Sequence, residues 1–99
     1  MRQDSLLIKL RCISLAISRE AIGAVSLDAN TTGSSNVAVG QAALSSNTTA
    51  SNNTAVGKSA LASNTTGTGN VGIGRTALGA NTTGANNAAL GAYALDANT

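Results

Sequence analysis

Residues 30–46 read NTTGSSNVAVGQAALSS, and this stretch recurs along the chain with a period of 17 residues. The later units are NTTASNNTAVGKSALAS at 47–63, NTTGTGNVGIGRTALGA at 64–80 and NTTGANNAALGAYALDA at 81–97, and a further unit starts at 98–99. Ile22, Gly23 and Leu27 continue the register backwards, so residues 19–29 are the second half of an earlier unit. The repeats therefore occupy 19–99, and residues 1–18 form a separate segment.

The length of the period selects the fold class. Helical repeats need about 33 residues or more, whereas 17 residues fit one coil of a parallel β-solenoid. Each coil is expected to hold two short strands, at Asn36–Val39 and Ala42–Leu44 in the unit 30–46. A glycine bend separates the strands, and the Asn-Thr-Thr-Gly turn closes the coil. The sequence thus predicts an all-β fold in which equivalent residues of successive coils stack about 4.8 Å apart.

Two columns of the repeat carry large apolar side chains and are predicted to face a core. One is branched or long in every unit (Ile22, Val39, Val56, Ile73, Leu90), and the other is always leucine (Leu27, Leu44, Leu61, Leu78, Leu95). A third column admits only alanine or glycine, and we expect it to let two backbones or two identical chains approach closely (Ala21, Ala38, Ala55, Gly72, Ala89). The branched and leucine columns thus define the expected interior, and the small column the expected contact with other chains.

Three other kinds of column have simpler interpretations. An unbroken glycine column indicates a bend or a positive φ (Gly23, Gly40, Gly57, Gly74, Gly91). The column after it tolerates Gln41, Lys58 and Arg75 and is therefore predicted to be solvated. Stacked asparagines are expected to hydrogen-bond between coils, which accounts for the columns that contain Asn30 and Asn36.

Composition excludes most kinds of chemistry. The chain of 99 residues has no histidine, no proline, one aromatic residue, one cysteine and a net charge of +2. Histidine ligands and clustered carboxylates are therefore missing, and nothing is present to activate a serine or Cys12. We predict no catalytic residue, no cofactor-binding residue and no metal ligand, and no nucleic-acid partner or membrane insertion.

Three motifs resemble binding or modification sites, and the repeat explains each of them. Gly67–Gly72 matches the dinucleotide fingerprint Gly-x-Gly-x-x-Gly, but its glycines fall in separate columns and no helix is expected after it. Gly57-Lys58-Ser59 resembles a phosphate loop that lacks its first glycine. Five Asn-x-Thr sequences are formal N-glycosylation acceptors, but the asparagine ladders already account for these residues (Asn30, Asn47, Asn52, Asn64, Asn81).

The segment Asn53-Thr54-Ala55-Val56-Gly57-Lys58-Ser59-Ala60-Leu61 and its sisters at Asn36 and Asn70 resemble the head repeats of trimeric autotransporter adhesins, the YadA-like family. Similar Asn-Thr-Thr-Gly arrays occur in bacteriophage tail fibres. The resemblance covers about 80 of the 99 residues. It implies a left-handed parallel β-roll, three chains side by side, and a role in adhesion or host recognition.

Two large apolar residues per coil are few for a free-standing solenoid, which independently favours an oligomer. We therefore expect a non-enzymatic structural or adhesive module in the head or shaft of a fibre. The fibre would be a homotrimer on a cell surface, such as the outer membrane, or on a virion, and it would contact a cell-surface or host receptor. Residues 1–18 remain open between a leader, a cap and a degenerate coil. The chain is interpreted as a piece of a longer fibre.

An ice-binding β-solenoid is the alternative function, because regular threonine ladders on a flat surface can order water. Adjacent threonines such as Thr31 and Thr32 would point to opposite faces of a strand, which argues against this alternative. Thermal hysteresis distinguishes the two functions.

Overall fold

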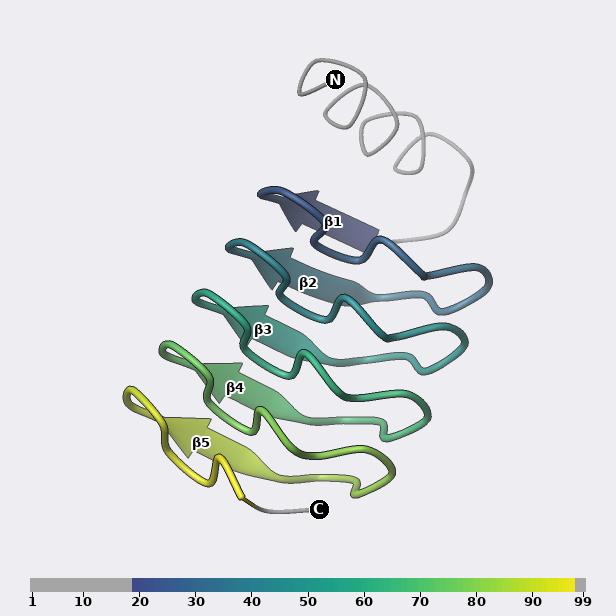
Figure 1. The fold of residues 1–99 in the computed structure, drawn as a ribbon. Helices are drawn as coiled ribbons and strands as arrows, with labels where there is room; N and C mark the ends of the chain where they lie inside the picture. Colours follow the sequence, from purple (N-terminus) through teal and green to yellow (C-terminus); the bar gives the residue numbers. More distant parts are fainter. Residues whose placement is uncertain (1–18, 98–99) are drawn as a thin grey trace.

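The computed structural model describes residues 19–97, which form a single parallel β-sheet. Five strands lie side by side in chain order (Figure 1): β1 (Arg19–Ile22), β2 (Asn36–Val39), β3 (Thr54–Val56), β4 (Val71–Ile73) and β5 (Ala88–Leu90). Residues 19–97 contain no helix, so the predicted all-β class is confirmed for this range. The leader, cap or degenerate coil predicted at 1–18 and the unit predicted to start at 98–99 lie outside the described residues.

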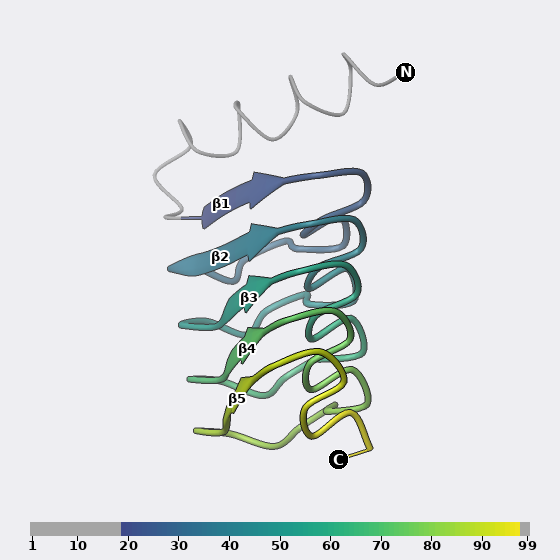
Figure 2. The same ribbon diagram turned by 90° about the vertical axis from the view of Figure 1, so that its left-hand side faces the viewer.

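Every strand pairs with the strand one repeat further along the chain. Ala38 lies opposite Ala55, which lies opposite Gly72, which in turn lies opposite Ala89. The segments between the strands stack in the same way (Figure 2), and the Asn52 amide donates to the Ser34 carbonyl at 3.1 Å. The sequence period is therefore also the structural period, and each column of the repeat becomes a row of stacked residues.

The Asn-Thr-Thr-Gly segment is a bend whose backbone amides donate hydrogen bonds to the following repeat. The amides of Thr31, Thr32 and Gly33 all donate to the Thr48 carbonyl oxygen, at 2.9, 3.2 and 3.3 Å. The third full repeat makes the same three bonds to the fourth. A concave row of successive N–H groups suits a single oxygen atom, so the bend links two repeats as well as reversing the chain.

A strand predicted at Ala42–Leu44 is absent, and turns take its place. The Ala43 amide donates to the Gly40 carbonyl at 3.2 Å, and the Ser45 amide donates to the Ala42 carbonyl at 3.2 Å. Bonds that reach three residues back define turns, whereas the expected strand would have bonded only to neighbouring repeats. Each repeat therefore contributes one strand to the sheet and a chain of turns behind it.

Positive φ angles are the physical reason for these turns. Ala42 and Leu44 have φ values of 63° and 52°, which no strand residue adopts. The same two columns are left-handed in every repeat, even where β-branched Val25 and Thr76 occupy them, at 53° and 61°. The turned backbone still bonds across repeats, since the Leu44 amide donates to the Ala60 carbonyl at 3.0 Å. Nothing in the sequence of these columns signals the left-handed conformation, because glycine and asparagine are absent from them.

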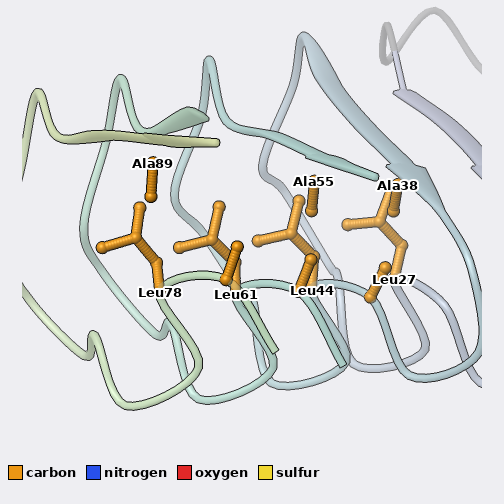
Figure 3. Packing of buried hydrophobic residues seen from close by; sticks show 10 residues of the cluster. Leu27, Ala38, Leu44, Ala55, Leu61, Leu78 and Ala89 are labelled. Atoms are coloured by element: carbon orange, nitrogen blue, oxygen red, sulfur yellow. The ribbon is translucent and has the colours of Figure 1, made fainter. Parts of the chain in front are cut away.

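The core is one row of leucines between the sheet and the turns. Leu44, Leu61 and Leu78 are fully buried and Leu27 nearly so, which confirms the predicted leucine ladder over these repeats. Figure 3 shows the leucines stacked along the row, with the strand alanines Ala38, Ala55 and Ala89 on the opposite side. Leu95, in the last described layer, is 50% exposed. The interior is so thin that each repeat before the last described layer buries only one large apolar side chain.

The glycine column lies at the end of each strand with φ between 125° and 129°. This conformation is open to glycine and strongly unfavourable for other residues. The repeats also approach closely here, because a Cβ on Gly57 would lie 2.7 Å from both the carbonyl carbon and the carbonyl oxygen of Gly74. The bend that the glycine column predicted is thus confirmed, and two independent constraints exclude a side chain.

A charge in the leucine row should unfold several repeats together. We expect Leu61→Asp to abolish the β-type circular dichroism signal, because it places an unpaired carboxylate in a dry interior one leucine wide. Lys58→Asp is the matched control on the exposed side of the same repeat, and its free energy of unfolding should change by about 0.5 kcal/mol or less. Equal urea melts for the two variants would contradict the assignment of the core.

The glycine column offers a second matched pair. Gly57→Ala should destabilise the chain by about 2 kcal/mol or more, because the new Cβ meets both a positive φ and a neighbouring carbonyl. Gly72→Ala introduces the residue that other repeats carry at the same strand position, so its free energy of unfolding should stay within about 1 kcal/mol. Urea denaturation measures both changes. Equal stability of the two variants would show that the glycine column is not required.

Candidate functional site

The outer face of the sheet is the candidate functional surface. Burial alternates along β2–β5, so that in β2 Asn36 and Ala38 are buried while Val37 and Val39 are partly exposed. Two columns therefore point away from the core. We call them the outer face, which consists of Val37, Thr54, Val71 and Ala88 in one column and Ile22, Val39, Val56, Ile73 and Leu90 in the other.

This outer face is apolar and uncharged. Its residues are aliphatic except Thr54, and it runs along β2–β5 with Ile22 of β1 at one end, while Glu20 holds the β1 position in the register of Val37. Exposed fractions reach 62% at Ile22, 36% at Val71 and 80% at Leu90. Parallel sheets are normally covered on both faces, and here no residue of 19–97 covers the outer one. A continuous apolar surface of this kind marks a site of interaction with another molecule.

Two columns exchange the roles that the sequence predicted. The branched column of Val39, Val56 and Ile73 was expected in the core, but its members lie on the outer face. The small column was expected at an outer contact between chains, but Ala38 and Ala55 are fully buried against the leucine row. Only one of the two predicted core columns is therefore correct.

Hydrogen bonding and size explain the exchange. Asn36 must turn inward, because its Nδ2 donates to the Ala50 carbonyl at 2.8 Å and its Oδ1 accepts from the Asn53 amide at 3.0 Å. Residues two apart in a strand share a face, so Ala38 turns inward together with Asn36. An alanine fits there because a leucine already fills the narrow interior. The asparagine that stands four residues before Gly40, Gly57, Gly74 and Gly91 is the sequence feature that indicates this orientation.

The asparagine column that begins at Asn30 forms a continuous side-chain ladder, as predicted. Asn47 Nδ2 donates to Asn30 Oδ1 at 2.9 Å, Asn64 Nδ2 to Asn47 Oδ1 at 3.1 Å, and Asn81 Nδ2 to Asn64 Oδ1 at 2.9 Å. The second predicted ladder differs in kind, because Asn36, Asn53 and Asn70 bond between repeats through backbone groups. Six of these asparagines are fully buried (Asn36, Asn47, Asn53, Asn64, Asn70, Asn81).

Motifs that resemble nucleotide sites do not form one. Within the apparent fingerprint, Gly67 lies in the threonine bend, Gly69 in a second bend with φ 69°, and Gly72 inside β4. Turns rather than a helix follow β4, so the amide cradle of a dinucleotide fold is not built. Gly57 and Lys58 likewise lie in a bend and an exposed turn.

The column predicted to be solvated is exposed at Gln41, Lys58 and Arg75. Arg75 has the clearest contact, because its Cζ lies 5.9 Å from the ring centroid of Tyr93 in the next repeat. This distance allows a weak cation–π interaction at the surface.

The threonine pairs lie in bends, which corrects the strand geometry assumed for them. Thr31 Oγ1 donates to the Thr48 carbonyl at 3.1 Å, and Thr65 Oγ1 donates to the Thr82 carbonyl at 3.2 Å. The second threonine of every pair is exposed (Thr32, Thr49, Thr66, Thr83). The first threonine is exposed at Thr31 and Thr82 and half-buried at Thr48 and Thr65, and its hydroxyl is bonded to a carbonyl at Thr31 and Thr65.

Over residues 19–97, no three His, Cys, Asp or Glu side chains gather where they could hold a metal ion. The same residues include no helix that is long and apolar enough to cross a membrane. Comparison with known proteins gives no relative, since no protein-family model, curated protein or solved structure matches this chain.

Replacing one buried asparagine tests the ladder. Asn53→Leu keeps the side-chain volume but leaves the Asn70 amide without a partner, and the Gly67 carbonyl keeps only the bond from Asn64 Nδ2. We expect a loss of about 1 to 3 kcal/mol in the free energy of unfolding, which is the cost of one unpaired buried group. The control is Asn52→Ser at the exposed neighbour, where the previous repeat carries Ser35 with a similar φ, and it should be silent. Urea melts of the two variants decide the point.

Proposed function

We propose that this protein is a non-enzymatic structural or adhesive repeat module of an extracellular fibre, carried on a cell surface or a virion. In this proposal the repeats form a left-handed parallel β-solenoid, and three identical chains assemble into the working unit. The resemblance of the repeats to trimeric adhesin heads and phage tail fibres supports the class of function. The apolar outer face is the observation that carries the proposal.

Copies of the same chain are the partners that suit this face best. Its columns repeat at the spacing of the strands, so an identical chain presents ridges and grooves with the same spacing. The part of the face formed by β2–β5 carries no charged residue that would select a charged partner. Covering Val39, Val56 and Ile73 would also add apolar burial to a chain whose own core is one leucine wide.

In the proposed trimer, three-fold symmetry places three identical outward-facing surfaces on one particle. Each chain would turn its outer face toward the axis, which leaves the bends and the column of Gln41, Lys58 and Arg75 on the outside. A receptor would then meet three equivalent surfaces on one rigid body. Linked weak contacts of this kind raise overall affinity without strong individual sites.

Sedimentation equilibrium tests the assembly. We expect a particle three times the 9.6-kDa mass of the chain at micromolar concentration. Val56→Glu should dissociate it, because the carboxylate would be buried between chains, while the partly exposed position lets the single chain keep its β signal. Lys58→Glu is the control in the same repeat and should remain associated.

A stable, β-rich monomer of the unaltered chain would contradict the trimer. Dissociation of both variants would show that charge, and not the apolar face, holds the chains together.

A further inference from the structure

Five Asn-x-Thr sequences occur in the chain, and the asparagine of one of them lies in a different structural environment from the other four. Four begin at members of the same side-chain ladder, of which Asn30 is half-buried and the other three are fully buried (Asn30, Asn47, Asn64, Asn81). The fifth begins at Asn52, in the bend just before β3, where the side chain is exposed. The sequence pattern is the same in all five, so any difference in reactivity must come from the fold.

Three of the ladder asparagines donate both amide hydrogens, and the half-buried Asn30 donates to the Gly33 carbonyl at 2.9 Å. Asn47 Nδ2 donates both to Asn30 Oδ1 at 2.9 Å and to the Ala50 carbonyl at 3.0 Å. Asn64 Nδ2 donates to Asn47 Oδ1 at 3.1 Å and to the Gly67 carbonyl at 2.9 Å. Asn81 follows the same pattern. An N-linked sugar replaces one of these hydrogens, so its attachment would break the ladder and force a bulky group into the interior.

The Asn52 side chain, by contrast, is exposed and has free space around it. Its side chain makes no hydrogen bond to any residue that the structure describes. The residues at the same position in the adjacent repeats are the small Ser35 and Gly69, which leave room around the amide. Thr54, the hydroxyl residue of the sequence, is partly exposed on β3. Both residues that a glycosyltransferase must reach therefore lie at the surface of the single folded chain.

We propose that Asn52 is the acceptor for an N-linked sugar, and that the folded chain closes the other four Asn-x-Thr sequences to modification. In the reaction, Asn52 Nδ2 forms a bond to C1 of a sugar supplied as a nucleoside diphosphate derivative. The bond from C1 to the diphosphate oxygen breaks, the nucleoside diphosphate leaves with the electron pair, and one amide proton passes through the transferase to water. No oxidant or reductant is involved.

The experiment uses the purified, folded chain with a soluble bacterial asparagine glycosyltransferase and UDP-glucose. Trypsin releases residues 20–58 as one peptide that holds Asn30, Asn47 and Asn52, so electron-transfer fragmentation must assign the modified asparagine. We expect the mass of one hexose at Asn52, at about ten times the extent of any other site or more, because the ladder asparagines react only through local opening.

Two variants each remove one acceptor sequence while the fold is expected to persist. Thr54→Val removes the hydroxyl but introduces the residue found at Val37 and Val71, so the fold should persist while the hexose is lost. Thr49→Ala removes the acceptor sequence of Asn47 at an exposed position and should leave the modification unchanged.

The inference does not rest on the proposed trimer. The assay is therefore run on the unaltered chain and on Val56→Glu, in which Thr54 cannot be covered by a neighbouring chain. Modification of Asn52 in either form supports the inference. Equal modification of Asn47 and Asn52 would overturn it. So would an unmodified Asn52 in both forms when a peptide of residues 49–57 is modified under the same conditions.

Discussion

Buried asparagine amides hold the repeats in register, and the remaining structure depends on them. Each amide bonds across the boundary between two repeats, so a slip of one residue would leave several polar groups unpaired in a dry interior. The same bonds decide which face of each strand turns inward, because Asn36 and its equivalents require carbonyl partners inside. In a chain with so little apolar volume, hydrogen bonding rather than hydrophobic packing specifies the structure, and the leucine row fills the space that is left.

How far the sequence predicts this fold depends on the type of residue in each column. The repeat correctly predicted the period, the position of the first strand, the glycine bend and the leucine row. The glycine and leucine columns were informative because each holds one residue type throughout, and that type favours one environment. The branched column was misplaced because valine suits either side of a strand, and only the bonding of Asn36 distinguishes the two sides. The second strand was wrong for a different reason. Ala42 and Leu44 hold left-handed angles that tertiary bonds impose against local preference, and no single-residue signal reports this.

Those left-handed residues affect how the chain gains stability. A non-glycine residue at positive φ is strained, and every repeat contains such residues at its turns. Each repeat buries only one leucine and a few alanines to offset that strain. Stability must then come from the inter-repeat hydrogen bonds, which add with each further repeat, and from any surface that a neighbouring molecule covers. An exposed apolar sheet face is therefore consistent with the energetics of the chain, because covering it supplies burial that the interior lacks.

The contrast between the two sides of the sheet also bears on how such a module changes in evolution. Interior columns are fixed by hydrogen bonds and by lack of space, so Asn36, Asn53 and Asn70 have no useful substitute. Exposed columns face no such constraint, and at one turn position the repeats carry Gln41, Lys58 and Arg75 in succession. Variation confined to exposed columns can alter charge, aromatic contacts or sugar acceptors one repeat at a time while the register stays intact. A repeat module built this way can acquire a new partner without a new core, which agrees with the proposed role in a fibre.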